Sequence, residues 1–84
     1  MIYKVEINKV ARKNLDRMSD SIVEPILKAI NKLAENPRPQ GYKKLKGRPG
    51  FRIRVGDYRI IYEIFEDVLL IEIVDLGHRK DIYE

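Results

Sequence analysis

The sequence FRIRVGDYRIIYEIFEDVLLIEIV, from Phe51 to Val74, is the most informative part of the chain about its fold. It holds three runs rich in β-branched and aromatic residues, which are typical of strands. The pairs Gly56-Asp57 and Glu66-Asp67 separate these runs and are short enough for two-residue hairpin turns. The stretch therefore predicts a three-stranded antiparallel meander, with strands at Phe51–Val55, Tyr58–Phe65 and Val68–Val74.

Upstream of the meander, the sequence predicts one strand and two helices. Tyr3, Val5 and Ile7 alternate with charged residues, as in a half-buried strand. A first helix, capped by Asn8, would bury the stripe Val10, Ala11, Leu15 and Met18, and a second stripe runs from Ile22 to Ala34. The start of the second helix stays open, because Ser21-x-x-Glu24 suggests a capping box and Pro25 fits it poorly.

This order predicts one α+β domain over residues 1–84. An N-terminal strand and two helices precede the three-stranded antiparallel meander, in one sheet with the helices packed on one face. Gln40–Gly50 is expected to be a loop.

Composition excludes several classes of protein. The longest aliphatic run, Val68–Ile71, is far too short to span a bilayer, and no leader for export is apparent, so we expect a cytoplasmic protein. The chain has no cysteine and one histidine, His78, so we expect neither a metal site nor a cofactor.

Basic residues are concentrated in one segment. Between Arg38 and Arg59 the chain carries eight basic residues and one acid, Asp57, whereas the rest is mildly acidic. Such a block is typical of a protein that binds phosphate backbones. We expect its loop residues to dock on RNA, although a merely solvated loop remains an alternative for the lysines; these residues are Lys43, Lys44, Lys46 and Arg48.

Hairpin register gathers arginines on one sheet face. A two-residue turn at Gly56-Asp57 puts Arg54 opposite Arg59 and Arg52 opposite Ile61, on the face away from the helices. A two-residue turn at Glu66-Asp67 would put Arg59 opposite Val74. The chain would then bring further candidates to the same edge, namely Arg79, His78 and Tyr83, while Glu63 and Glu72 lie toward the far end.

Converging arginines without a metal suit phosphate chemistry, since the guanidinium fork matches phosphate oxygens. RNA is cut without metal when its 2′-hydroxyl attacks the neighbouring phosphorus, which requires a proton acceptor, a proton donor and charge stabilisation. Tyr83 and His78 are the candidate proton-handling groups near the arginines.

The same residues carry a family resemblance. The stretch from Phe51, the segment Gly77-His-Arg-Lys-Asp-Ile-Tyr83, Asn36-Pro37 and Lys44-Leu-Lys-Gly47 together resemble the RelE/ParE toxin superfamily. RelE-type members are toxins of toxin–antitoxin pairs that cleave mRNA in the ribosomal A site, and ParE-type members inhibit DNA gyrase. The resemblance implies a ribosome carrying mRNA and an acidic antitoxin as partners, the latter in a hetero-oligomer.

The resemblance also assigns roles to residues. It places the phosphate-stabilising arginine at Arg59, the second catalytic arginine at Arg79 and the C-terminal tyrosine at Tyr83. RelE has lysines where this chain has Arg52 and Arg54, and arginine is a poor base, so Tyr83 becomes the expected base with His78 left open. The main expectation is a metal-independent endoribonuclease. A ParE-like gyrase inhibitor and a non-catalytic RNA-binding module remain the alternatives.

Overall fold

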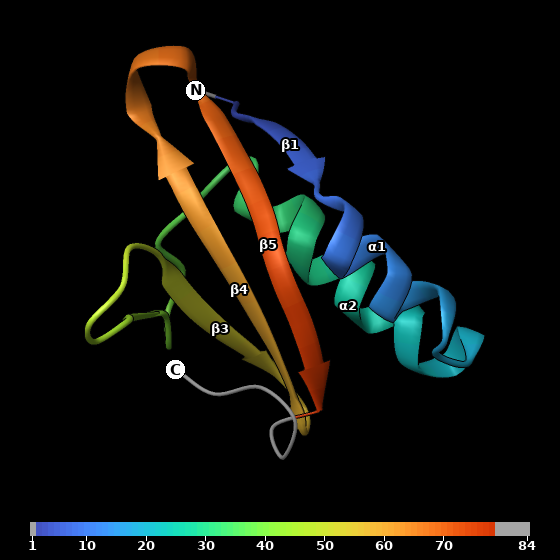
Figure 1. Ribbon diagram of the computed structural model, residues 1–84. Coiled ribbons are helices and arrows are strands. Elements are labelled where there is room, and N and C mark those ends of the chain that lie inside the picture. The colour runs from blue at the N-terminus through green and yellow to red at the C-terminus, as the bar shows by residue number, and fades with distance from the viewer. Residues whose placement is uncertain (1, 79–84) are drawn as a thin grey trace.

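The computed structural model describes residues 2–78 as a sheet with helices against one face (Figure 1). Along the chain the elements are β1 (Lys4–Ile7), α1 (Lys9–Asp16), α2 (Asp20–Leu33), β2 (Lys43–Lys44), β3 (Phe51–Val55), β4 (Tyr58–Phe65), the 3-10 helix η1 (Glu66–Val68) and β5 (Leu70–His78). The strands form one sheet in the order β1-β5-β4-β3-β2. β1 runs parallel to β5, and the other neighbouring strands are antiparallel.

The predicted α+β architecture is confirmed, with two additions to the meander. The N-terminal strand enters the same sheet as the parallel neighbour of β5. A short strand, β2, forms inside the segment expected to be a loop, where Lys43 pairs with Arg52 and Lys44 with Phe51. This pairing satisfies backbone groups that β3 would otherwise present along an open edge.

Both predicted helices are present, but the buried face of α1 and the start of α2 differ from the prediction. Asn8 caps α1 as expected, because its Oδ1 accepts a hydrogen bond from the Ala11 N–H at 2.9 Å. Val10, expected in the buried stripe, is 55% exposed. α2 begins one residue before Ser21 with Ser19 as its N-cap, so the capping box does not form, and Pro25 lies inside the helix. Within residues 2–78 no helix is long and apolar enough to cross a membrane.

The core fills the space between the helices and the sheet. Its buried members are Ala11, Leu15, Ile26, Ile30, Leu33, Ile53, Ile60, Tyr62, Ile71, Ile73 and Leu76. Each fully buried aliphatic side chain contributes about 1.5–3 kcal/mol relative to an exposed one, so this cluster is the main source of stability. Tyr62 is 0% exposed, and its hydroxyl donates to the Pro37 carbonyl at 2.6 Å. Burial raises the pKa of Tyr62 to about 12.

The second hairpin differs from the prediction. Its turn is not the pair Glu66-Asp67 but the four residues from Glu66 to Leu69, since Phe65 pairs directly with Leu70. η1 occupies most of this turn, and Leu69 closes it in the left-handed region with φ of 50°. Accordingly β5 starts two residues later than expected and continues to His78.

A β-bulge shifts the register of β5 further. Tyr62 pairs with Ile73 but the preceding Ile61 pairs with Asp75, so Val74 is an extra residue on β5. The prediction that Arg59 faces Val74 is therefore wrong, and Arg59 lies opposite Gly77. A side chain from α1 supports the bulge: Asn14 Nδ2 donates to Asp75 Oδ1 at 3.0 Å and to the Leu76 carbonyl at 2.9 Å.

Candidate functional site

The arginines of β3 and β4 come together as predicted. Arg54 and Arg59 are directly paired across the two strands, and Arg52 pairs with Ile61 on the same side of the sheet. We call this side, opposite the helices, the arginine face. Directly opposed residues have Cβ atoms about 5 Å apart, so the Arg54 and Arg59 stems are close neighbours. Arg54 is exposed, Arg59 is half-buried and Arg52 is only 4% exposed.

The hairpin between β3 and β4 fixes this register. Its two-residue turn is Gly56-Asp57, with Val55 paired to Tyr58. Gly56 has φ of 59°, a conformation that suits glycine at the first central position of a tight hairpin turn. A turn of this length admits one register, which is why the arginine pairing was predictable.

The middle of the arginine face is apolar. Leu45, Ile61 and Val74 form a small buried cluster there. Leu45 reaches it because the loop after β2 folds back, with the Leu45 N–H donating to the Gly50 carbonyl at 3.0 Å. Gly50 must lack a side chain, since a Cβ there would lie 2.9 Å from the Tyr62 carbonyl oxygen.

The four basic loop residues expected to dock on RNA are all exposed, and the structure divides them between two sides. Lys43 pairs with Arg52 and so lies on the arginine face. Lys44 pairs with Phe51 and lies on the side of the helices. Lys46 and Arg48 follow in the loop around Leu45.

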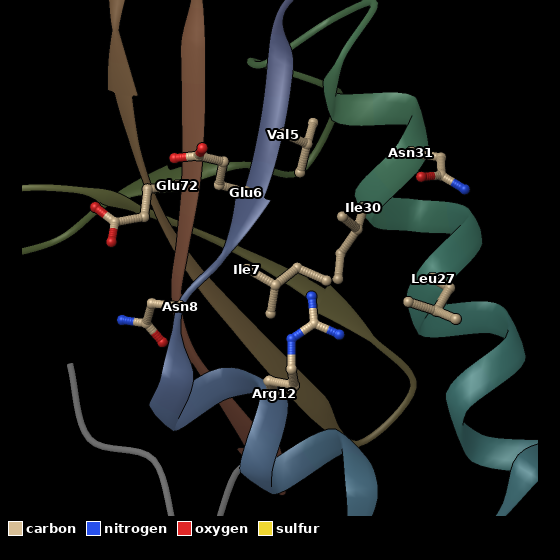
Figure 2. Close-up of a pocket in the computed structure, with 9 residues that line it drawn as sticks. All are labelled: Val5, Glu6, Ile7, Asn8, Arg12, Leu27, Ile30, Asn31 and Glu72. Carbon is tan, nitrogen blue, oxygen red and sulfur yellow. The ribbon is translucent and has the colours of Figure 1, made fainter.

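A row of glutamates crosses the far end of the arginine face. Glu72 of β5 pairs with Glu6 of β1 on one side and with Glu63 of β4 on the other. Glu6 and Glu72 point away from the helices (Figure 2). Since Glu63 lies four residues from Arg59 along β4, the row is about 13 Å from that arginine. The glutamates therefore give the face opposite charges at its two ends without neutralising the arginines.

His78 lies on the other side of the sheet. It pairs with Tyr58, whose ring packs against the helix-side core, and the two rings meet edge-on with centroids 5.5 Å apart. The prediction that His78 lies near the arginines on the arginine face is wrong, because the bulge moves His78 to the other side of β5. The longer turn shifts the pairing by two residues and so leaves side chains on their predicted side. Gly77, opposite Arg59, adds no side chain to that face.

The remaining predicted site residues, Arg79 and Tyr83, lie outside the described residues. Among residues 2–78, no group of three histidine, aspartate or glutamate side chains is placed to hold a metal ion.

A groove of about 460 Å³ lies between β1 and the helices. Val5 and Ile7 from β1 and Leu27 and Ile30 from α2 form its apolar part, and Arg12 of α1 rises between them (Figure 2). Polar side chains complete the lining, namely Glu6, Asn8, Asn31 and Glu72. β1 is an edge strand, so its outer side is not covered by another strand of residues 2–78. Sequence reasoning missed this groove, because no local pattern indicates that β1 and α2 pass each other.

Comparison with known proteins gives consistent results. A family model described as the ParE toxin of the type II toxin–antitoxin system parDE matches residues 5–83. The mRNA interferase toxin RelE of Escherichia coli K12 is 23% identical over 83 residues, which cover 95% of this chain and 86% of that protein. The toxin RelG of Mycobacterium tuberculosis is 29% identical over 85 residues, covering 99% and 98%.

A solved structure extends the likeness to the fold. The archaeal RelE–RelB complex from Pyrococcus horikoshii OT3 contains a chain that superimposes with a TM-score of 0.82 at 30% identity, covering 98% of this chain and 100% of that chain. The chain described here thus belongs to the ParE toxin family of type II toxin–antitoxin systems. The resemblance to the RelE/ParE superfamily is confirmed, and the relatives described above are named RelE or RelG.

Proposed function

We propose that this toxin is a metal-independent endoribonuclease that cleaves mRNA in the A site of cytoplasmic ribosomes. The observation that carries the proposal is the direct pairing of Arg54 with Arg59, beside the buried Arg52. Like charges directly opposed destabilise a sheet, so this arrangement costs stability that phosphate binding would offset. The name mRNA interferase, borne by the Escherichia coli relative, supports the same chemistry.

In the proposed reaction the 2′-hydroxyl of one nucleotide attacks the neighbouring phosphorus. The bond to the leaving 5′-oxygen breaks, and a 2′,3′-cyclic phosphate forms. One proton leaves the 2′-hydroxyl and another is delivered to the 5′-oxygen. Arg59, with Arg54, would hold the phosphate oxygens and stabilise the charge of the pentacoordinate phosphorus, and Arg79 would act as the second catalytic arginine.

Proton transfer is assigned to Tyr83. The guanidinium groups of Arg52 and Arg54 do not deprotonate in proteins and so make poor bases. The placement of His78 on the helix side of the sheet, against Tyr58, favours Tyr83 over His78.

The proposed partner in the resting state is a small acidic antitoxin. The solved archaeal relative is a complex of RelE with RelB, which supports such a pairing. The groove between β1 and α2 has apolar side chains that suit the apolar side of an amphipathic segment, with the cation Arg12 and the acids Glu6 and Glu72 around them. An acidic partner would also be attracted to the arginine face.

One observation favours a second candidate, inhibition of DNA gyrase without nuclease chemistry. The matching family model carries the ParE description, and ParE-type toxins act on gyrase. The two candidates separate in paired assays. Purified toxin should cut mRNA on translating ribosomes and leave gyrase supercoiling unchanged. Inhibition of supercoiling without mRNA cleavage would establish the gyrase inhibitor. RNA binding without cleavage would indicate a non-catalytic RNA-binding module.

The site itself is tested by Arg59→Ala. Loss of one group that stabilises transition-state charge typically lowers the rate about 10²–10³-fold. Arg17→Ala, a change to an exposed arginine on the helical side, is the matched control and should cut normally. Arg59→Ala with parental cleavage would refute the role of the arginine face.

Docking is tested separately from chemistry. Neutralising Lys43, Lys44, Lys46 and Arg48 together should weaken ribosome binding and flatten its salt dependence, since each phosphate contact contributes about 0.7–0.9 to the logarithmic slope. The rate at saturating ribosome concentration should stay near the parental value. An unchanged slope would leave this loop merely solvated.

A further inference from the structure

A chain of aromatic rings leads from the core to the surface beside β2. Tyr62 is fully buried, Phe51 is half-buried and Tyr42 is 37% exposed. The centroids are 5.9 Å apart both between Tyr62 and Phe51 and between Phe51 and Tyr42. Tyr42 is thus supported by packed rings from below while part of its own ring faces solvent.

Backbone and side-chain contacts hold this surface in place. The Tyr42 N–H donates to the Pro39 carbonyl at 3.0 Å, closing a turn in which Gly41 has φ of 90°. That is the pattern of a type II turn, which needs glycine at this position. Arg38 lies over the Phe51 ring, with Cζ 5.6 Å from the centroid, and its Nη1 is 3.6 Å from Glu66 Oε1. Little conformational freedom would be lost on binding a flat ligand here.

The charge around Tyr42 is positive. Lys43 and Lys44 follow Tyr42 directly, and no acid occurs from Arg38 through Gly56. Lys44 lies on the same side of the sheet as Phe51, whereas Lys43 lies with Arg52 on the arginine face. Glu66, the acid beside Arg38, also accepts a hydrogen bond from the Tyr3 hydroxyl at 2.9 Å. An exposed ring next to cations that lead around a sheet edge suits a nucleotide, with its base on the ring and its phosphate at a lysine.

We propose that Tyr42 and Lys44 form a second RNA contact, in which an unpaired base stacks on Tyr42 and its phosphate binds Lys44. Phe51 supports the Tyr42 ring from behind, and Arg38 lies over the Phe51 ring. The contact lies across the sheet edge from the arginine face, so it would bind RNA next to the cleaved nucleotides and not at the scissile phosphate. This inference rests on the proposed action on RNA, but it predicts binding that does not depend on cleavage.

The experiment uses the intact toxin and a fluorescein-labelled 12-nucleotide uridine RNA containing one 5-iodouridine. Anisotropy measures affinity, and ultraviolet crosslinking followed by mass spectrometry identifies the ring that stacks on the iodouridine. The parent should bind and crosslink at Tyr42. Tyr42→Phe should bind within about twofold of the parent, because the stacking surface is kept.

Tyr42→Leu is the decisive variant, since leucine preserves apolar contact with Phe51 and removes the π surface. Affinity should fall about 5- to 150-fold, which corresponds to the 1–3 kcal/mol typical of one base stacked on an aromatic ring. Lys44→Gln should lower the salt slope by about 0.7. Val68→Ala, at an exposed apolar residue elsewhere, should change nothing.

The outcomes separate this inference from the proposed function. Suppose that Tyr42 crosslinks, that Tyr42→Leu abolishes the crosslink, and that the toxin does not cleave mRNA on ribosomes. This combination would support the RNA contact and refute the nuclease activity. Ribosomal cleavage combined with equal RNA affinity for the parent and Tyr42→Leu would overturn the contact. A parent that neither binds nor crosslinks the RNA would overturn it as well.

Discussion

Arg59 lies opposite Gly77, and the extra residue Val74 on β5 is what brings the two together. Because Gly77 has no side chain, β5 places none directly opposite the Arg59 stem. The Asp75 carboxylate, directly after the bulge, contacts α1, where Asn14 donates to it. Asp75 pairs with Ile61, but its carboxylate is held by this contact with α1 and not beside the arginines.

The first prediction concerns Asn14 and Asp75. Asp75 Oδ1 accepts hydrogen bonds from Asn14 Nδ2 at 3.0 Å and from the Leu76 N–H at 2.8 Å. Asn14→Ala should lower the free energy of unfolding by about 1–3 kcal/mol, because partly buried polar groups lose their partner. Urea unfolding measures the change. Asp75→Asn is the matched control, since its carbonyl oxygen still accepts both bonds; an unchanged midpoint for Asn14→Ala would contradict the supporting role.

The second prediction concerns the glutamate row. Glu72 lies between Glu6 and Glu63 on neighbouring strands, and like charges directly opposed destabilise a sheet by about 0.2–1 kcal/mol. Glu72→Gln should therefore raise the melting temperature, and Glu72→Lys should raise it further. The gain should shrink in 1 M salt, where screening is strong. Glu35→Gln, at an exposed position after α2, is the control and should have little effect. A rise in the melting temperature of the Glu72 variants that does not depend on salt would exclude the electrostatic explanation.

Sequence alone determined the first hairpin and failed at the second for a physical reason. The glycine of Gly56-Asp57 adopts positive φ, and a two-residue loop leaves one register for Arg54 and Arg59. In the second turn the residue with positive φ is Leu69, and leucine gives no signal for that conformation. The bulge depends on Asn14, which is 61 residues from Asp75 in sequence, so no local pattern reveals it.

The same difference between local sequence signals and long-range contacts explains other parts of the structure. The alternation of Tyr3, Val5 and Ile7 predicted a strand, but its parallel pairing with β5 is a long-range choice made by packing. The basic block was visible in composition, whereas the opposite orientation of Lys43 and Lys44 required the register of β2. The side of the sheet on which His78 lies was missed because the bulge reverses the side-chain alternation of β5 after Val74, whereas the two-residue error in the turn leaves that alternation unchanged.

The third prediction concerns alkaline pH. Burial raises the pKa of Tyr62 to about 12, so the native state keeps the phenol protonated, whereas an unfolded tyrosine ionises near pH 10. The resulting stability is fully present below pH 10 and is lost as pH rises toward 12, by about 3 kcal/mol in all.

Tyr62→Phe tests this prediction, because phenylalanine cannot ionise. At pH 7 the variant should be about 1 kcal/mol less stable than the parent, since it lacks the hydrogen bond to the Pro37 carbonyl. Above pH 10 the difference between the two proteins should narrow. Urea unfolding at pH 7, 10 and 11 measures both effects, and a constant difference across this range would contradict the assigned pKa.

The last prediction separates the two proton-transfer candidates, Tyr83 and His78. His78 packs edge-on against Tyr58 on the helix side of the sheet, whereas the phosphate chemistry is proposed for the arginine face. His78→Gln should therefore keep single-turnover cleavage of ribosome-bound mRNA within a few-fold of the parent, with a small loss of stability. Tyr83→Phe removes the proposed base and should lower the rate about 10²–10⁴-fold, the usual contribution of general acid–base catalysis.

A truncation after Asp81 provides a second route to the same answer. It removes Ile82, Tyr83 and Glu84 and leaves the helices and the sheet of residues 2–78 in place, which circular dichroism checks. The truncated toxin should bind ribosomes and fail to cut. Parental cleavage by Tyr83→Phe, together with loss of cleavage in His78→Gln, would transfer the role of base to His78 and would require RNA to reach the helix side of the sheet end.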